Sequence, residues 1–103
     1  MGRWLGDELR RLRLARGLSL RDLAQEIGMA HTGYVAYERG VATPPPERRP
    51  ALALVLGITA PELDELIEED EYEVFLRARS LSEEGRAAVR DFLRMIRERE
   101  RRP

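Results

Sequence analysis

Few side chains in this sequence have the chemistry for catalysis or metal binding. Cysteine is absent, and the single histidine, His31, has no acid or nucleophile partner at the spacing of a catalytic motif. The hydroxyl residues Ser19, Thr59 and Ser82 each stand at the expected start of a helix, where a hydroxyl caps backbone amides. We therefore expect no catalytic residue, no metal and no cofactor, and an enzyme is disfavoured.

The side chains suited to hydrogen bonding and ionic contact gather in residues 17–40. Ser19 is predicted to begin a helix, with Asp22 three residues later in a pattern close to a capping box. An apolar face follows at helical spacing, and Gly28 permits the left-handed turn that precedes a second helix over residues 30–39. Two short helices joined in this way can place one of them in the major groove of DNA.

The remaining segments predict the helices that hold this pair in place. Apolar residues recur at helical spacing over residues 5–15, and Gly17 stops that helix. Residues 41–50 contain four prolines, which predict a loop or a late helix start. One helix is expected around residues 52–56 and another from Thr59 onward. The sequence has no strand pattern, so we predict an all-α fold.

Charge is segregated along a chain whose formal net charge is only −1. Residues 1–49 hold nine arginines and six acids, whereas residues 50–76 hold eight acids and no arginine. Residues 77–103 again hold nine arginines, against five acids. The overall charge therefore says little about contact with nucleic acid, which depends on the local charge. The acidic block can lie against the arginine-rich tail of its own or a second copy and leave the first three helices free for DNA. The acidic run at residues 68–73 is either a continuation of the fifth helix or a linker.

The last third of the chain predicts one amphipathic helix. A serine followed by two glutamates marks its start, because acids are favourable at the positive end of a helix dipole. Its apolar stripe, at positions i, i+3, i+4 and i+7, consists of Val89, Phe92, Leu93 and Ile96. This stripe either joins two copies of the chain or docks within one copy, onto the fifth helix and the apolar cluster at residues 74–76.

Residues 9–67 resemble the helix-turn-helix domain of the phage-repressor and Cro family, often called the XRE family. The resemblance rests on Leu12-Arg13, Gly17-Leu18-Ser19, Leu23-Ala24, Ile27-Gly28, Glu38-Arg39-Gly40, Pro44, Ala53, Leu56-Gly57, Leu63 and Leu66. It implies a five-helix, lambda-repressor-like DNA-binding domain over residues 1–67. An acidic linker or helix extension would follow at residues 68–80, and the C-terminal helix at residues 81–103.

The resemblance also implies the residues that contact DNA. The family reads bases from the start of its third helix and from one turn later, and those positions here are His31, Thr32, Val35 and Ala36. Histidine and threonine can hydrogen-bond base edges, while alanine and valine can contact a thymine methyl group. The implied phosphate contacts are Arg13, Ser19, Arg21, Arg39 and Thr43. An ion pair between Arg13 and Glu38 is implied as well, the alternative being a plain surface pair.

The third helix departs from the family pattern. Ala30 stands where a serine or threonine usually caps this helix, and Gly33 lies within it; each costs about 1 kcal/mol of helix stability. We therefore expect the helix to finish ordering on DNA. Tyr34 and Tyr37 are predicted in the core rather than as stacking platforms, which disfavours RNA binding. His31 is either a base reader or a solvated side chain.

These features predict a sequence-specific double-stranded DNA-binding transcriptional regulator, with a repressor of an inverted repeat as the leading hypothesis. One helix in one groove makes few contacts, so a homodimer reading half-sites one turn apart, about 34 Å, is expected. The alternative is an antitoxin-like protein that binds a partner protein and autoregulates its operon. No apolar run is long enough to span a membrane and no signal-peptide pattern is present, so a cytoplasmic protein without membrane contact is expected.

Overall fold

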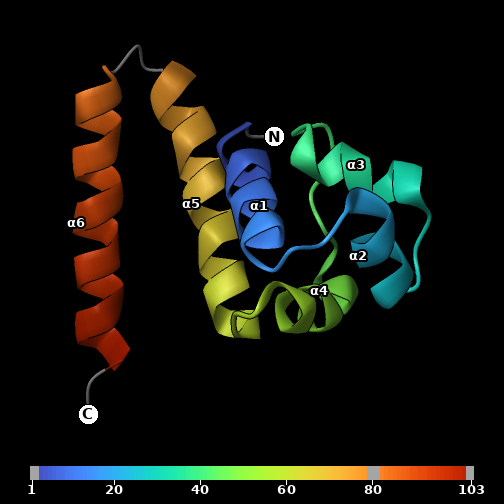
Figure 1. Cartoon of the computed structure of the whole chain (residues 1–103). Coiled ribbons are helices and arrows are strands. Elements are labelled where there is room, and N and C mark those ends of the chain that lie inside the picture. Colours follow the sequence, from blue (N-terminus) through green and yellow to red (C-terminus); the bar gives the residue numbers. More distant parts are fainter. Residues whose placement is uncertain (1–2, 79–81, 102–103) are drawn as a thin grey trace.

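The computed structural model describes residues 3–78 and 82–101, with the side chains of residues 4–73 and 82–100, and this part of the chain forms helices without strands (Figure 1). The elements are α1 (Arg3–Ala15), α2 (Leu20–Glu26), α3 (His31–Glu38), the 3-10 turn η1 (Pro46–Arg48), α4 (Arg49–Leu56), α5 (Ala60–Ala78) and α6 (Glu83–Arg101). The predicted all-α fold is confirmed. None of the described helices is long and apolar enough to cross a bilayer.

The core is built around α1, which lies between α3 and α5 (Figure 1). Its buried apolar side chains come from all five of the first α-helices: Leu5, Leu9, Leu23, Ala24, Tyr34, Tyr37, Leu52, Ala53, Leu56, Leu63 and Ile67. Tyr34 and Tyr37 belong to this core, as predicted, and their rings meet edge to face with centroids 5.9 Å apart.

Local sequence signals define the helix ends. The Ser19 hydroxyl accepts a hydrogen bond from the Asp22 amide at 3.0 Å, and the Asp22 carboxylate accepts one from the Ser19 amide at 3.3 Å. Thr59 and Glu62 form the same reciprocal capping box at the start of α5. Gly28 has a φ of +67°, so it supplies the left-handed residue that turns the chain from α2 into α3.

The acidic run at residues 68–73 is helical, because α5 continues without interruption to Ala78. α6 runs back along α5, on the side away from α1 (Figure 1). The expected helix at residues 81–103 is thus present from Glu83 to Arg101, while residues 81, 102 and 103 lie outside the described part.

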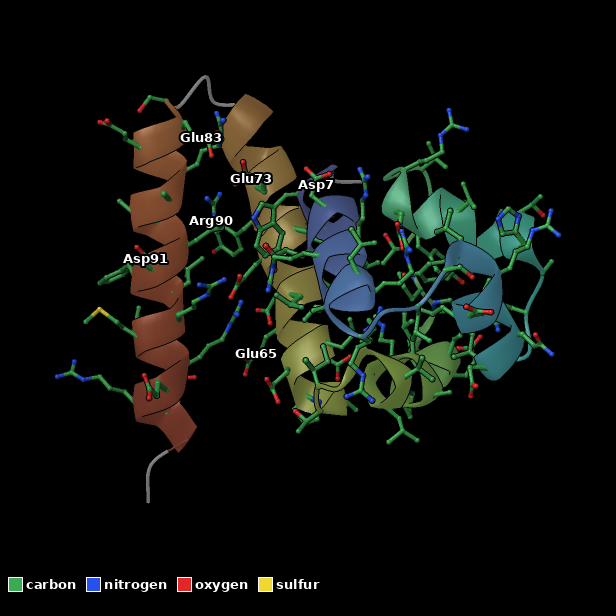
Figure 2. The ribbon with its side chains drawn as sticks, viewed as in Figure 1. Asp7, Glu65, Glu73, Glu83, Arg90 and Asp91 are labelled. Atoms are coloured by element: carbon green, nitrogen blue, oxygen red, sulfur yellow. The ribbon has the colours of Figure 1, made fainter. Side chains whose placement is uncertain are left out.

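Arginine side chains hold α6 against α5. Arg94 donates two hydrogen bonds of 2.9 Å to Glu69, which is only 2% exposed. One turn further along α5, Glu73 accepts hydrogen bonds from Arg86, at 2.8 Å, and from Arg90. Figure 2 shows Arg90 and Glu73 pointing into the space between the two helices. The contact between α5 and α6 therefore depends heavily on charge pairing, which salt weakens.

In this arrangement only part of the apolar stripe of α6 is covered. Val89 and Leu93 are half-buried, whereas Phe92 and Ile96 are exposed to 60% and 37%. The neighbouring Met95 is 62% exposed. None of these side chains packs against the core, so docking within the chain uses only part of the stripe. The alternative contact with residues 74–76 lies outside the described side chains.

Candidate nucleic-acid interface

The predicted base readers share one side of α3. Tyr34 and Tyr37 face the core, so Thr32, Val35 and Ala36 lie on the opposite side, and His31, three residues before Tyr34, lies at the edge of that side. Thr32 is exposed, and the other three are half-buried: His31, Val35 and Ala36. This side therefore offers two hydrogen-bonding side chains beside two small apolar ones.

The start of α3 lacks a side-chain cap, as the sequence predicts. Ala30 is its N-cap residue and makes no side-chain hydrogen bond. The surroundings of Gly33 leave room for a small side chain, since an added Cβ would meet only the flexible end of the Met29 side chain, 2.9 Å away. The glycine is therefore not required by packing among the described residues.

The ion pair between Arg13 and Glu38 is present and buried. Arg13 donates to the two Glu38 carboxylate oxygens at 2.7 and 3.1 Å, and each side chain is only 8% exposed. The third guanidinium nitrogen donates to the carbonyl of Leu18 at 2.8 Å. Hydrogen bonding to Glu38 raises the pKa of Arg13, and burial raises the pKa of the nearby Tyr34 phenol. The pair ties α1 to the end of α3 and to the chain before α2.

This geometry bears on the expected phosphate contacts. Arg13 donates from all three guanidinium nitrogens to Glu38 and Leu18, so it has a structural role, and a phosphate contact would have to use its two remaining N–H groups. The other candidates lie at the start of α2 and just after α3. Arg21 and Arg39 are exposed, and Thr43 is half-buried. Ser19 is exposed, but its hydroxyl is occupied in the capping box.

Gly6 is a residue of this site that sequence reasoning missed. It lies in α1 at the crossing with α3, where an added Cβ would overlap the carbonyl oxygen of Glu38. The same atom would lie 2.7 Å from the Glu38 carbonyl carbon and 3.1 Å from the Tyr37 oxygen. Only a glycine allows the two backbones to approach this closely. A glycine inside an otherwise regular helix is the one sequence signal that could have indicated the contact.

A comparison with protein families agrees with this geometry. A family model described as a helix-turn-helix domain matches residues 4–66, the segment that runs from α1 into α5. No curated protein and no solved structure matches the chain. The chain belongs to the helix-turn-helix domain family, a class of DNA-binding modules typical of regulators rather than of enzymes.

Proposed function

We propose that this chain is a cytoplasmic transcriptional regulator of the XRE type that binds a specific double-stranded DNA sequence. It inserts α3 into the major groove and acts as a repressor at an inverted repeat. The observation that supports this most is the free side of α3. Within a helix-turn-helix domain, this side carries His31 and Thr32, which can hydrogen-bond base edges, next to Val35 and Ala36.

The proposed phosphate contacts flank this helix. Arg39 caps the carboxyl end of α3, and Thr43 follows in the loop. On the other side, Arg21 and Ser19 belong to the start of α2, where backbone amides also favour an anion. Contacts of this kind fix the register of the protein on the duplex without reading its sequence.

We further propose that two copies pair through the outer face of α6, defined as Ala88, Phe92, Met95 and Ile96. This face lies roughly half a turn around the helix from Arg90 and the other arginines that face α5. Exposed Asp91 and Arg99 stand four residues on either side of Met95. An antiparallel pair of α6 helices would therefore place each Asp91 beside the second copy's Arg99, and opposite charges favour that register.

Pairing through α6 changes the expected half-site spacing. Going outward from α6, the helices follow the order α5, α1, α3 (Figure 1). Neighbouring helix axes are about 8–10 Å apart, and three such separations lie between α6 and α3 in each copy. With one more separation between the two α6 helices, the two α3 helices lie on the order of 60 Å apart. That distance is closer to two turns of DNA, about 68 Å, than to one turn of about 34 Å.

In-vitro selection of DNA bound by the full chain tests the function. We expect an enriched inverted repeat. Thr32→Ala should relax the preference at particular base pairs, because in the proposed complex the threonine hydrogen-bonds base edges. Arg39→Ala should instead weaken binding to all sequences and reduce the slope of log Kd against log salt by about one unit.

Arg11→Ala is the matched control for Arg39→Ala, since Arg11 is equally an exposed arginine but lies beside Glu8 on the part of α1 that faces α5 and Arg94 of α6. It should leave the salt slope for one half-site unchanged. No enriched sequence at low salt would contradict the proposed function, and co-purification of a small partner protein would favour the antitoxin-like alternative.

The α6 contact is tested by Phe92→Arg. The unaltered chain should sediment as a dimer at micromolar concentration, and the variant as a monomer, because an arginine would charge the centre of the outer face. Leu54→Arg is the control, since Leu54 is even more exposed, at 77%, but lies on α4. A monomeric unaltered chain, with and without DNA, would contradict this interface.

A further inference from the structure

A buried carboxylate of α5 holds the start of α1. Asp70 is 3% exposed, and its Oδ1 accepts a hydrogen bond of 2.9 Å from the backbone amide of Leu5, 65 residues away in sequence. The first turn of α1 carries no acidic residue of its own. Asp70 therefore supplies to α1, from another helix, the negative charge that favours a helix amino terminus.

Asp70 is itself firmly placed. Its neighbour Glu69 is buried and is bound by Arg94 of α6 through two hydrogen bonds, with a third from Arg97 at 3.3 Å. This turn of α5 is thus attached to α6 on one side and to α1 on the other. A carboxylate so placed can set the position of α1, rather than only following it.

The residue after Leu5 transmits that position to the recognition helix. Gly6 contacts the last carbonyl groups of α3 with no room for even a methyl group. A displacement of the start of α1 therefore changes how it supports Tyr37 and Glu38. A second attachment between these helices is the Arg13–Glu38 pair, which holds the same end of α3. Both attachments join α1 to the carboxyl end of α3. The base readers lie on the outer side of this same helix, from its first residue onward.

We propose that Asp70 is a positioning residue for DNA recognition: by fixing the start of α1, it sets how α3 is presented to the major groove. This inference rests on the proposed function, since it assigns Asp70 a role in base preference. It adds a residue on α5, outside the helix-turn-helix pair, to those that determine specificity.

The test compares Asp70→Leu, which removes the acceptor, with Asp70→Asn, which keeps an oxygen for the Leu5 amide. Glu71→Leu is the matched control, because Glu71 is the adjacent acid and is exposed. Under conditions where each variant is folded, Asp70→Leu should lose about tenfold or more in affinity for the selected site and show a flattened base preference. Asp70→Asn should retain most of both, and Glu71→Leu should match the unaltered chain.

Amide chemical shifts separate positioning from general stability. Asp70→Leu should shift the amide signals of Gly6, Tyr37 and Glu38 in the free protein. Asp70→Asn, which keeps the acceptor but loses the charge, should shift the same signals by a smaller amount, and this smaller shift decides the question if the Leu variant does not fold. In the Leu variant, unchanged base preference or unchanged signals at the end of α3 would overturn the proposal. Where that variant does not fold, unchanged signals in the Asn variant would overturn it. If the unaltered chain selects no DNA, the proposed function fails, while the same signals still decide whether Asp70 positions α3.

Discussion

Gly6→Ala should lower both the stability of the protein and its affinity for DNA. The new methyl group would overlap the Glu38 carbonyl, and both partners are helix backbone, which cannot rotate away as a side chain can. Overpacking of this kind costs about 1–3 kcal/mol. Relief requires α1 and α3 to separate, and this moves the recognition helix relative to the rest of the domain. We therefore expect a loss of affinity of about tenfold or more for the selected site.

Gly33→Ala is the matched control, because it adds the same methyl group to a helix glycine in the same domain. Its Cβ would meet only the terminal carbon of Met29, which can move. Since alanine is favoured over glycine inside a helix by up to about 1 kcal/mol, this variant should be as stable as the unaltered chain or more stable. Urea denaturation gives both stabilities. Equal stability of the two variants would contradict the close approach at Gly6.

Gly33→Ala also bears on the prediction that α3 completes its folding on DNA. The alanine should increase protection of the α3 amides from exchange in the free protein. Full protection of those amides in the unaltered chain without DNA would contradict the prediction.

The features that sequence could predict here are local ones. The capping boxes at Ser19 and Thr59 involve residues three apart, so their spacing alone specifies them. Likewise, the inward position of Tyr34 and Tyr37 follows from helical periodicity. The Arg13–Glu38 pair joins residues 25 apart and was expected only because of the family resemblance.

The features that were missed depend on which helices meet. Periodicity marks Val89, Phe92, Leu93 and Ile96 as one apolar stripe, and the charge segregation allows the acidic block to lie against the arginine-rich tail, but neither pattern specifies which side of α6 faces α5. The hydrogen bond from the Leu5 amide to Asp70 and the contact at Gly6 likewise require the relative placement of α1, α3 and α5. A sequence pattern fixes the faces of each helix, and the contacts between helices decide which of those faces are covered.

Arg13→Leu should destabilise the domain by about 3–5 kcal/mol, because it leaves the buried Glu38 carboxylate without its partner. Small domains are stable by only about 5–15 kcal/mol, so a large share of the folding free energy would be lost. Urea denaturation measures the effect. Arg11→Ala is the control: its partner is Glu8 and its side chain is 64% exposed, so its loss should cost under about 1 kcal/mol.

The double variant Arg13→Leu with Glu38→Leu should recover most of that loss, since replacing both charges removes the uncompensated one. Recovery should remain incomplete, because the Leu18 carbonyl also loses its donor. Single variants that cost no more than Arg11→Ala would contradict the burial of the pair. The DNA affinity of the double variant then shows whether Arg13 contacts a phosphate or acts through the fold. If affinity per folded molecule is kept in the double variant, the arginine acts through the fold, and the phosphate contacts belong to Arg21 and Arg39.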